Sequence, residues 1–266
     1  MRFILAASLV VLASVALAQQ VKPPQTPPAP PPAPSPQTMK LRVIVDLSEP
    51  HFAARTSDGR LAGFDIDLLQ ALCARLRADC IVEAVDWDEL RADIAVGKAD
   101  LAAGGIEIGS LPAERSVFVA PYGRVPLAIA VRKGEKLEVN AAGLKDKRIA
   151  VQRSTRWARW LKEGGAATVV ELETPDDVRA ALSTGKVDGA LMDRRRVATW
   201  LAGPAGACCE LAKPDIREVG ATGPGIAFLL RSDIKLKELV EKAMAGLRDD
   251  GTVRRLAAKH LPFPLM

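Results

Sequence analysis

Hydrophobic and polar positions follow two different periods from Leu41 onward. Short apolar runs at 41–45, 81–85 and 99–105 have the length and composition of buried strands. Between them, residues 65–77 and the stretch that begins at Trp87 place apolar side chains at helical spacing. Strands that alternate with helices predict an α/β fold with mostly parallel sheets.

This pattern occurs twice along the chain. Residues 88–102 align without gaps on 176–190 with 7 identities in 15, and each segment predicts a helix, a Gly-Lys turn and a short strand. Residues 41–48 similarly resemble 147–154, although the offset is 106 there and 88 in the first case. Chance similarity of two amphipathic helices is the alternative. We predict two similar lobes with unequal connections rather than a solenoid.

Polar residues follow several of the predicted strands. They stand at 46–49, 104–107, 153–156 and 193, and the internal alignment makes Gly105 equivalent to Asp193 on the other lobe. In an open α/β sheet, ligands collect outside the carboxyl ends of the strands. We therefore expect a ligand cleft where the two lobes face each other.

The N-terminal residues predict export. Residues 1–18 combine Arg2, an apolar stretch and a final Ala-Leu-Ala, which is typical of a cleaved signal peptide, with an uncleaved membrane anchor as the alternative. Residues 19–39 hold 9 of the 19 prolines and predict a disordered linker. We therefore expect a periplasmic protein.

Composition narrows the chemistry. The net charge of +5 is spread without a long basic block, which disfavours nucleic-acid binding. The two histidines, His51 and His260, do not form a metal-ligand pattern with the four cysteines, so no metal or cofactor is expected. No set of nucleophile, base and orienting group is present in the motifs, so we expect no enzyme.

The cysteines of an exported chain should meet an oxidising compartment. Cys73 lies on the predicted helix and Cys80 opens the next strand, so a disulfide between them would join helix to strand across a short loop. For Cys208 and Cys209, a vicinal disulfide, two free thiols and an intermolecular link all stay open.

Several motifs together carry a family resemblance. They are "LAGFDIDLLQALCARL", "WDELRADIAVGKADLAAGG", "ERSVFVAPY", "KRIAVQRST", "VRAALSTGKVDGALMD" and the stretch from "GPGIAFLLRSDIKLKELV" to "AAKHL". In this order they resemble the bacterial extracellular solute-binding proteins of family 3, the polar amino-acid-binding proteins of ABC importers. The resemblance covers about residues 40–262, and the Cys73 and Cys80 pair matches a disulfide of some members.

The resemblance implies a type II periplasmic-binding-protein-like fold with two hinge strands. Residues 40–123 plus 222–266 would form lobe 1, and residues 124–221 would form lobe 2. The chain would be a monomer that captures a small polar, amino-acid-like or cationic solute between its lobes. It would then present this solute to an ABC permease in the inner membrane.

Binding an amino acid requires a carboxylate for the ammonium group and a guanidinium for the carboxylate of the ligand. The resemblance implies Asp193 and Arg115 for these roles, Trp87 as an aromatic that packs on the ligand, and hydroxyls at a helix N-terminus. The expected ligand-binding residues are Asp46, Glu49, Trp87, Gly104, Gly105, Glu107, Arg115, Ser154, Thr155, Arg156 and Asp193.

Most of these residues have a structural alternative. Asp193 could cap the helix that follows it, and Ser154 could cap the helix after the strand at 148–152. Trp87 could cover a core edge, Asp46 could bond within its loop, and Arg115 could lie on the surface.

Glu107 departs from the family pattern. Family members usually carry a small hydroxyl residue here, and an ionised glutamate would repel the ligand's carboxylate. Glu107 could pair with Arg115 or Arg156 inside the cleft, it could face a cationic group of the ligand, or it could mark a site that no longer binds amino acids. Glu49 likewise replaces a frequent aromatic clamp.

Two other functions remain open at this stage. The fold family also resembles a periplasmic dehydratase of prephenate or arogenate, in which Glu107 or Asp193 would act as the general acid. A non-transport sensory or envelope protein, docked through its proline-rich arm, is the other alternative.

Overall fold

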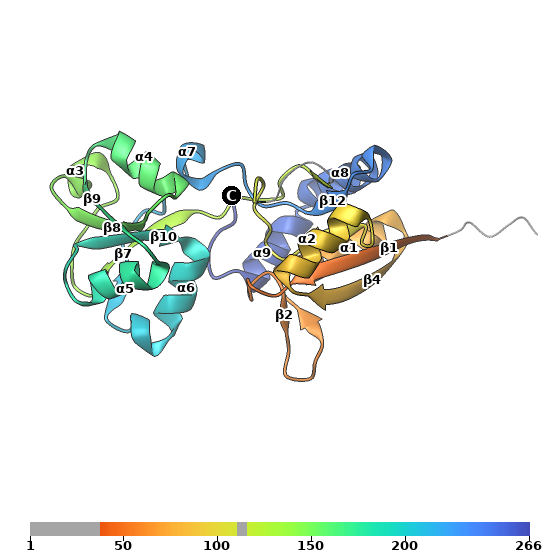
Figure 1. The fold of residues 1–266 in the computed structure, drawn as a ribbon, viewed down its shortest axis with the longest axis horizontal. Coiled ribbons are helices and arrows are strands. Elements are labelled where there is room, and N and C mark those ends of the chain that lie inside the picture. The colour runs from red at the N-terminus through yellow and green to blue at the C-terminus, as the bar shows by residue number, and fades with distance from the viewer. Residues whose placement is uncertain (1–37, 111–115) are drawn as a thin grey trace, which may run out of the picture. The chain divides into compact units, whose positions relative to one another are not determined.

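The computed structural model describes residues 38–110 and 116–266. The expected signal peptide, nearly all of the proline-rich linker and Arg115 lie outside the described residues. The described residues form two α/β lobes, and each lobe is built on a mixed five-stranded sheet (Figure 1). The two-lobed fold class predicted from the sequence is confirmed.

The first sheet has the strand order β4-β1-β5-β12-β6. Its strands are β1 Met39–Asp46, β4 Ala78–Val85, β5 Leu101–Ala103, β6 Ser116–Phe118 and β12 Leu229–Arg231. β1 runs parallel to β4 and β5, whereas β12 is antiparallel to β5 and β6. A strand from the end of the chain therefore completes the sheet that the N-terminal part begins.

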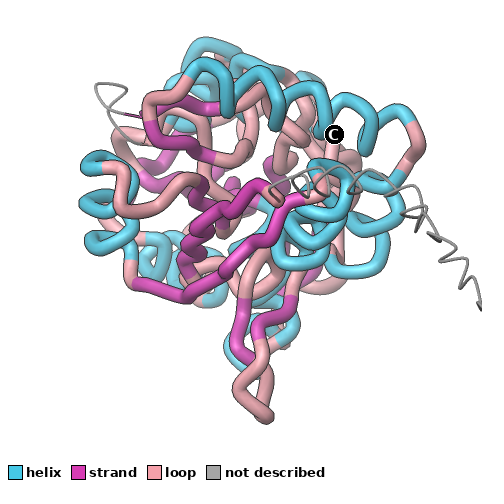
Figure 2. The backbone as a smooth tube through the Cα atoms, turned by 90° about the vertical axis from the view of Figure 1, so that its right-hand side faces the viewer, coloured by secondary structure: helices cyan, strands magenta, loops and turns pink. Residues whose placement is uncertain are grey.

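Helices cover both faces of this sheet. They are α1 Phe64–Leu76, α2 Trp87–Val96, α8 Ile234–Asp249 and α9 Thr252–His260. α1, α8 and α9 share one buried apolar cluster, and α2 packs through Leu90 and Ile94 on the other face. A short hairpin of β2 Ala54–Arg55 and β3 Leu61–Ala62 extends away from the sheet (Figures 1 and 2).

The second sheet has the order β11-β7-β10-β8-β9. Its strands are β7 Leu127–Arg132, β8 Arg148–Gln152, β9 Thr168–Leu172, β10 Gly189–Asp193 and β11 Cys209–Leu211. Its helices are α3 Ala141–Leu144, α4 Arg156–Gly164, α5 Pro175–Ser183, α6 Arg194–Ala202 and α7 Val219–Thr222, with a 3-10 turn at Pro204–Gly206. In Figure 1, α4 and α5 lie on opposite sides of this sheet.

The internal repeat corresponds to one structural unit in each lobe. Residues 88–102 lie in α2 and β5, and residues 176–190 lie in α5 and β10. Both helices are followed by a glycine in the left-handed region, Gly97 with φ 73° and Gly185 with φ 74°. Glycine adopts this conformation without a steric penalty, which explains the shared Gly-Lys turn.

The four cysteines form two disulfides in the structure. Cys73 on α1 is bonded to Cys80 on β4, with their Cα atoms 6.2 Å apart, as predicted. Cys208 and Cys209, for which three arrangements were open, are bonded to each other. Among residues 38–110 and 116–266, no helix has the length and apolar character needed to cross a bilayer.

Candidate functional site

A buried carboxylate organises the loop that follows β5. The amide N–H groups of Gly104 and Gly105 each donate to Oδ2 of Asp65 at 2.8 Å, and the hydroxyl of Tyr122 donates to both Asp65 oxygens. Burial raises the pKa of Asp65 to about 6, although these donors lower it. Asp65 on α1 therefore fixes the backbone of the loop that follows β5.

Gly105 must be glycine at this position. Its φ is +73°, and a Cβ atom would lie 2.9 Å from Cγ of Phe52. The same backbone turn exposes the Gly105 carbonyl to the side chain of Arg195 on α6, whose Nη1 donates to it at 3.2 Å. The loop thus presents a carbonyl acceptor to a residue from the second sheet's lobe.

Arg195 is the centre of the site. Its side chain is only 6% exposed. Nε and Nη2 donate to Asp193 at 3.0 and 2.8 Å, and Nη2 also donates to Oε1 of Glu107 at 2.5 Å. The guanidinium lies 5.8 Å from the centre of the Phe52 ring, and Nη1 is 3.8 Å from Glu49.

The electrostatics of this cluster follow from burial and proximity. Burial alone would lower the pKa of Arg195, but Asp193, Glu49 and Glu107 outweigh it and raise the pKa above its ordinary value. Burial raises the pKa of Glu49, and the guanidinium of Arg195 acts in the opposite direction. One buried guanidinium therefore faces three carboxylates, and the neighbouring Arg196 also lowers the pKa of Glu49.

Four of the expected residues line one cavity of about 220 Å³. Glu107 and Asp193 contribute carboxylates to its wall, whereas Thr155 and Arg156 stand at the start of α4. The hydroxyl of Thr155 caps α4 by accepting from the N–H of Ala158. A helix N-terminus attracts anions, so the cavity has a negative part and a positive part.

Trp157 adds an unused donor to this cavity. It lines the same space, and its indole Nε1 is buried without a hydrogen-bond partner among the described residues. A buried polar group without a partner costs free energy, so a solute oxygen that accepted from this indole would be stabilised.

A second space lies on the other side of Arg195. This cavity of about 770 Å³ is lined by Glu49 from the first lobe, by Arg195 and Arg196 on α6, and by residues of α5. Glu49 and Glu107 therefore flank the same guanidinium but line different cavities. Within the described residues, no group of three or more His, Cys, Asp or Glu side chains could hold a metal ion.

Other expected residues have local structural roles. Asp46 accepts from the amide and hydroxyl of Ser48 at 3.2 and 3.0 Å, within its own loop. Trp87 packs against the apolar cluster under α2 and lines neither cavity described above. Ser154 has a left-handed φ of 60°, and Thr155 rather than Ser154 caps α4.

Two expectations for the acidic residues need correction. Glu107 does pair with an arginine, and its partner among the described residues is Arg195 rather than Arg156. Asp193 both caps α6, by accepting from the N–H of Arg195, and holds the guanidinium of that residue. Asp193 is therefore already engaged by an internal cation at the place expected for a ligand's ammonium group.

The sequence reasoning missed Arg195, Asp65 and Trp157. Arg195 is the middle residue of an Arg-Arg-Arg run, and nothing in that run marks which arginine turns inward. Asp65 looked like an ordinary acidic residue in the first turn of a helix. The available signal is that Asp65, the fifth residue of the "LAGFDIDLL" motif, lies on the apolar face of that helix.

Two α/β lobes with a polar cavity at their facing strand ends define a two-lobed solute-binding protein. The sequence profile of "Bacterial extracellular solute-binding proteins, family 3" matches residues 41–263. The chain belongs to this family.

Relatives agree with this assignment, and solved structures share the fold. The chain is 27% identical to the histidine-binding periplasmic protein of Salmonella typhimurium, over 84% of this chain and 88% of that protein. It is 28% identical to the lysine/arginine/ornithine-binding periplasmic protein of Escherichia coli, over 98% and 96%. An arginine transport-system periplasmic binding protein from Legionella pneumophila superposes with a TM-score of 0.58 at 27% identity, over 84% of this chain and 100% of that one. The unliganded, open L-cystine solute receptor of Neisseria gonorrhoeae superposes with a TM-score of 0.68 at 17% identity, over 86% and 95%.

Proposed function

We propose that this protein is a periplasmic solute-binding protein that delivers a small zwitterionic solute of the amino-acid class to an ABC permease. The observation that carries the proposal is the cavity of about 220 Å³, which combines carboxylates with the positive end of α4. Pockets for drug-sized ligands are typically about 300–1,000 Å³, so this smaller space fits a solute the size of an amino acid. We place lobe 1 at 40–123 plus 222–266 and lobe 2 at 124–221, with export by a cleaved signal peptide and function as a monomer.

In this proposal, the solute's carboxylate lies at the first turn of α4. Thr155 and Arg156 stand there, and the exposed Arg156 has no hydrogen-bond or ion-pair partner among the described residues. The buried Nε1 of Trp157 supplies a further donor. Free donors, a positive side chain and the helix dipole all favour an anionic group at this end.

The solute's ammonium group would bind to Glu107. Arg195 already occupies both oxygens of Asp193, whereas only Oε1 of Glu107 bonds to Arg195 and its side chain remains 53% exposed. A glutamate at this position therefore replaces the acceptor that the internal arginine has taken. It also explains how an acidic residue can stand in an amino-acid site without repelling the solute as a whole.

The names of the relatives support this class of solute, because they bind histidine or lysine, arginine and ornithine. In this proposal the solute must carry both an ammonium group and a carboxylate. A cation without a carboxylate leaves the α4 end empty, and a carboxylate without a cation faces Glu107 unpaired.

Isothermal titration of the protein with L-arginine, L-lysine, L-histidine, L-glutamine, L-alanine, putrescine and acetate tests the proposal. We expect at least one amino acid to bind, and putrescine and acetate to bind about tenfold or more weakly, because each lacks one charged contact. Glu107→Gln should lower the affinity for the amino acid that binds by about tenfold or more, since a charged hydrogen bond is replaced by a neutral one.

The matched control is Glu238→Gln, because Glu238 is exposed on α8 and has no side-chain partner among the described residues. Equal affinities of Glu107→Gln and Glu238→Gln would show that Glu107 is not the ammonium site. Failure of every amino acid to bind the wild-type protein would reject the transport proposal and favour an envelope protein with a diverged site.

A further inference from the structure

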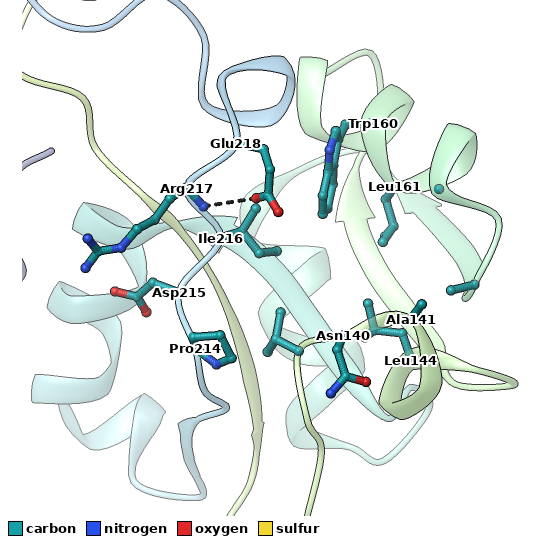
Figure 3. A pocket seen from close by; sticks show the side chains of 13 residues that line it. Asn140, Ala141, Leu144, Trp160, Leu161, Pro214, Asp215, Ile216, Arg217 and Glu218 are labelled. Carbon is teal, nitrogen blue, oxygen red and sulfur yellow. Dashed lines mark hydrogen bonds between the residues drawn. The ribbon is translucent and has the colours of Figure 1, made fainter.

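A third cavity lies wholly within the lobe of the second sheet. It has a volume of about 670 Å³ and is bounded by α3, α4 and the segment 214–218 that leads into α7 (Figure 3). It shares no lining residue with the cavity of Glu107, so the two spaces are distinct. A concave space of this volume with mostly apolar walls and few polar groups has the character of a small-molecule site.

The walls are largely apolar and include one half-buried aromatic ring. Leu144, Leu161 and Ile216 are buried members of the same core cluster, and Trp160 packs against that cluster from α4. In Figure 3, the Trp160 side chain stands at the edge of the cavity opposite Ile216 and Glu218. An aromatic or branched apolar group would therefore find apolar surface on several sides.

Two carboxylates, Asp215 and Glu218, and one guanidinium, Arg217, line the cavity. Asp215 lies 3.4 Å from Nε of Arg194, and both side chains are largely buried, so this carboxylate has a counter-charge. Glu218 is exposed, and no lysine or arginine side chain of the described residues lies within ion-pair distance of it. Its Oε2 only accepts from the backbone N–H of Arg217, at 3.1 Å.

The arrangement of Arg217, Glu218 and Trp160 indicates which charge a ligand of this cavity would carry. Figure 3 shows the Arg217 side chain directed away from Trp160, whereas the Glu218 carboxylate lies on the side of the indole. The face of an indole attracts cations, and so does a carboxylate without a counter-charge. An ammonium group between them would satisfy both.

We propose that this cavity binds a small organic ammonium ion with an aromatic or branched apolar body. The apolar part packs among Leu144, Leu161 and Ile216, and the ammonium group lies between Glu218 and the Trp160 ring. This site is independent of the solute that the other cavity takes. The two sites share α4 without sharing residues, because the start of α4 lines the cavity of Glu107 whereas Trp160 and Leu161 line this one.

The probe that tests this site is 2-phenylethylamine, with 3-phenylpropionate as the anion of similar size. Titrations of the protein with each compound, followed by tryptophan fluorescence and calorimetry, should show the amine binding about tenfold more tightly than the acid. Glu218→Gln should weaken amine binding about two- to fivefold, as expected for a partly exposed charge contact. Because Glu218 is exposed, this isosteric variant should fold normally.

Glu163→Gln is the matched control, since Glu163 is exposed on the same helix as Trp160 and does not line the cavity. It makes the same change in net charge and should leave amine binding unaltered. Equal binding of the amine and the acid, or equal effects of Glu218→Gln and Glu163→Gln, would overturn the proposal. So would loss of amine binding in Glu107→Gln, because the amine would then occupy the other cavity.

Discussion

Removing the guanidinium of Arg195 should destabilise the protein strongly and in a pH-dependent way. Arg195→Met keeps most of the apolar stem but deletes every side-chain donor to Asp193, Gly105 and Glu107, and only the backbone N–H of residue 195 still donates to Asp193. The Arg195 and Asp193 side chains are 6% and 7% exposed, so the variant leaves a buried carboxylate without a counter-charge. Breaking a buried pair in this way costs about 3–5 kcal/mol.

For a protein of this size, about 1 kcal/mol corresponds to about 2–4 °C in Tm, so we expect a decrease of about 6–20 °C. Most of this cost arises from Asp193, because Glu107 is half exposed and water screens its charge. Differential scanning calorimetry of Arg195→Met beside Arg196→Met measures it. Arg196 is exposed and has no side-chain hydrogen bond or ion pair among the described residues, so its variant should lie within about 0.5 kcal/mol of wild type.

The stability deficit of Arg195→Met should also change with pH, in a direction that the pKa of Glu49 sets. Arg195 lowers the pKa of Glu49, so without it that pKa should rise further above the ordinary value. A carboxylate whose pKa is raised in the folded state contributes stability at low pH that is lost as the pH rises through that pKa. The deficit of Arg195→Met should therefore be smaller at pH 5 than at pH 8. A deficit below about 0.5 kcal/mol, or one that is equal at both pH values, would refute the reasoning.

Three further predictions concern the stability of the structure around the site. Because the pKa of Asp65 is raised to about 6, the stability of wild type should fall as the pH rises through that value, and Asp65→Asn should flatten the dependence in pH-resolved melting curves. Replacing Cys73 and Cys80 by serine opens a bridge of sequence separation 7, and denaturant titration should show a loss of about 2–3 kcal/mol. Gly105→Ala should lose more stability than Gly59→Ala, since both glycines have left-handed φ values but only Gly105 has a side chain within 3 Å of the added Cβ. Equal losses in thermal melts would remove the packing argument.

The sequence predicted the fold well because periodicity and spacing report on local structure. The helix at 65–77 and the paired units at 88–102 and 176–190 correspond to observed elements with errors of a residue or two. The bond between Cys73 and Cys80 followed from their places on a helix and the next strand. These features depend on residues that are close in sequence.

The site was less accessible because its contacts join distant parts of the chain. Glu107 and Arg195 are 88 residues apart, and no local pattern selects Arg195 over its two arginine neighbours. Trp87 illustrates a related ambiguity, since a large aromatic after a strand suits both a ligand cleft and a core edge, and in the structure its half-buried ring packs against the core. Which of two environments a side chain enters depends on the tertiary arrangement.

The position of β12 has a consequence for the order of folding. β12 hydrogen-bonds to both β5 and β6, yet it is made after every strand of the second sheet. The second sheet draws its strands from the continuous stretch 127–211, whereas the first needs contacts between residues more than a hundred positions apart. Short-range contacts form faster because they close smaller loops. During synthesis or refolding, the lobe in the middle of the chain should therefore acquire hydrogen-exchange protection first, and the lobe that holds both ends should follow once residues 229–231 are in place.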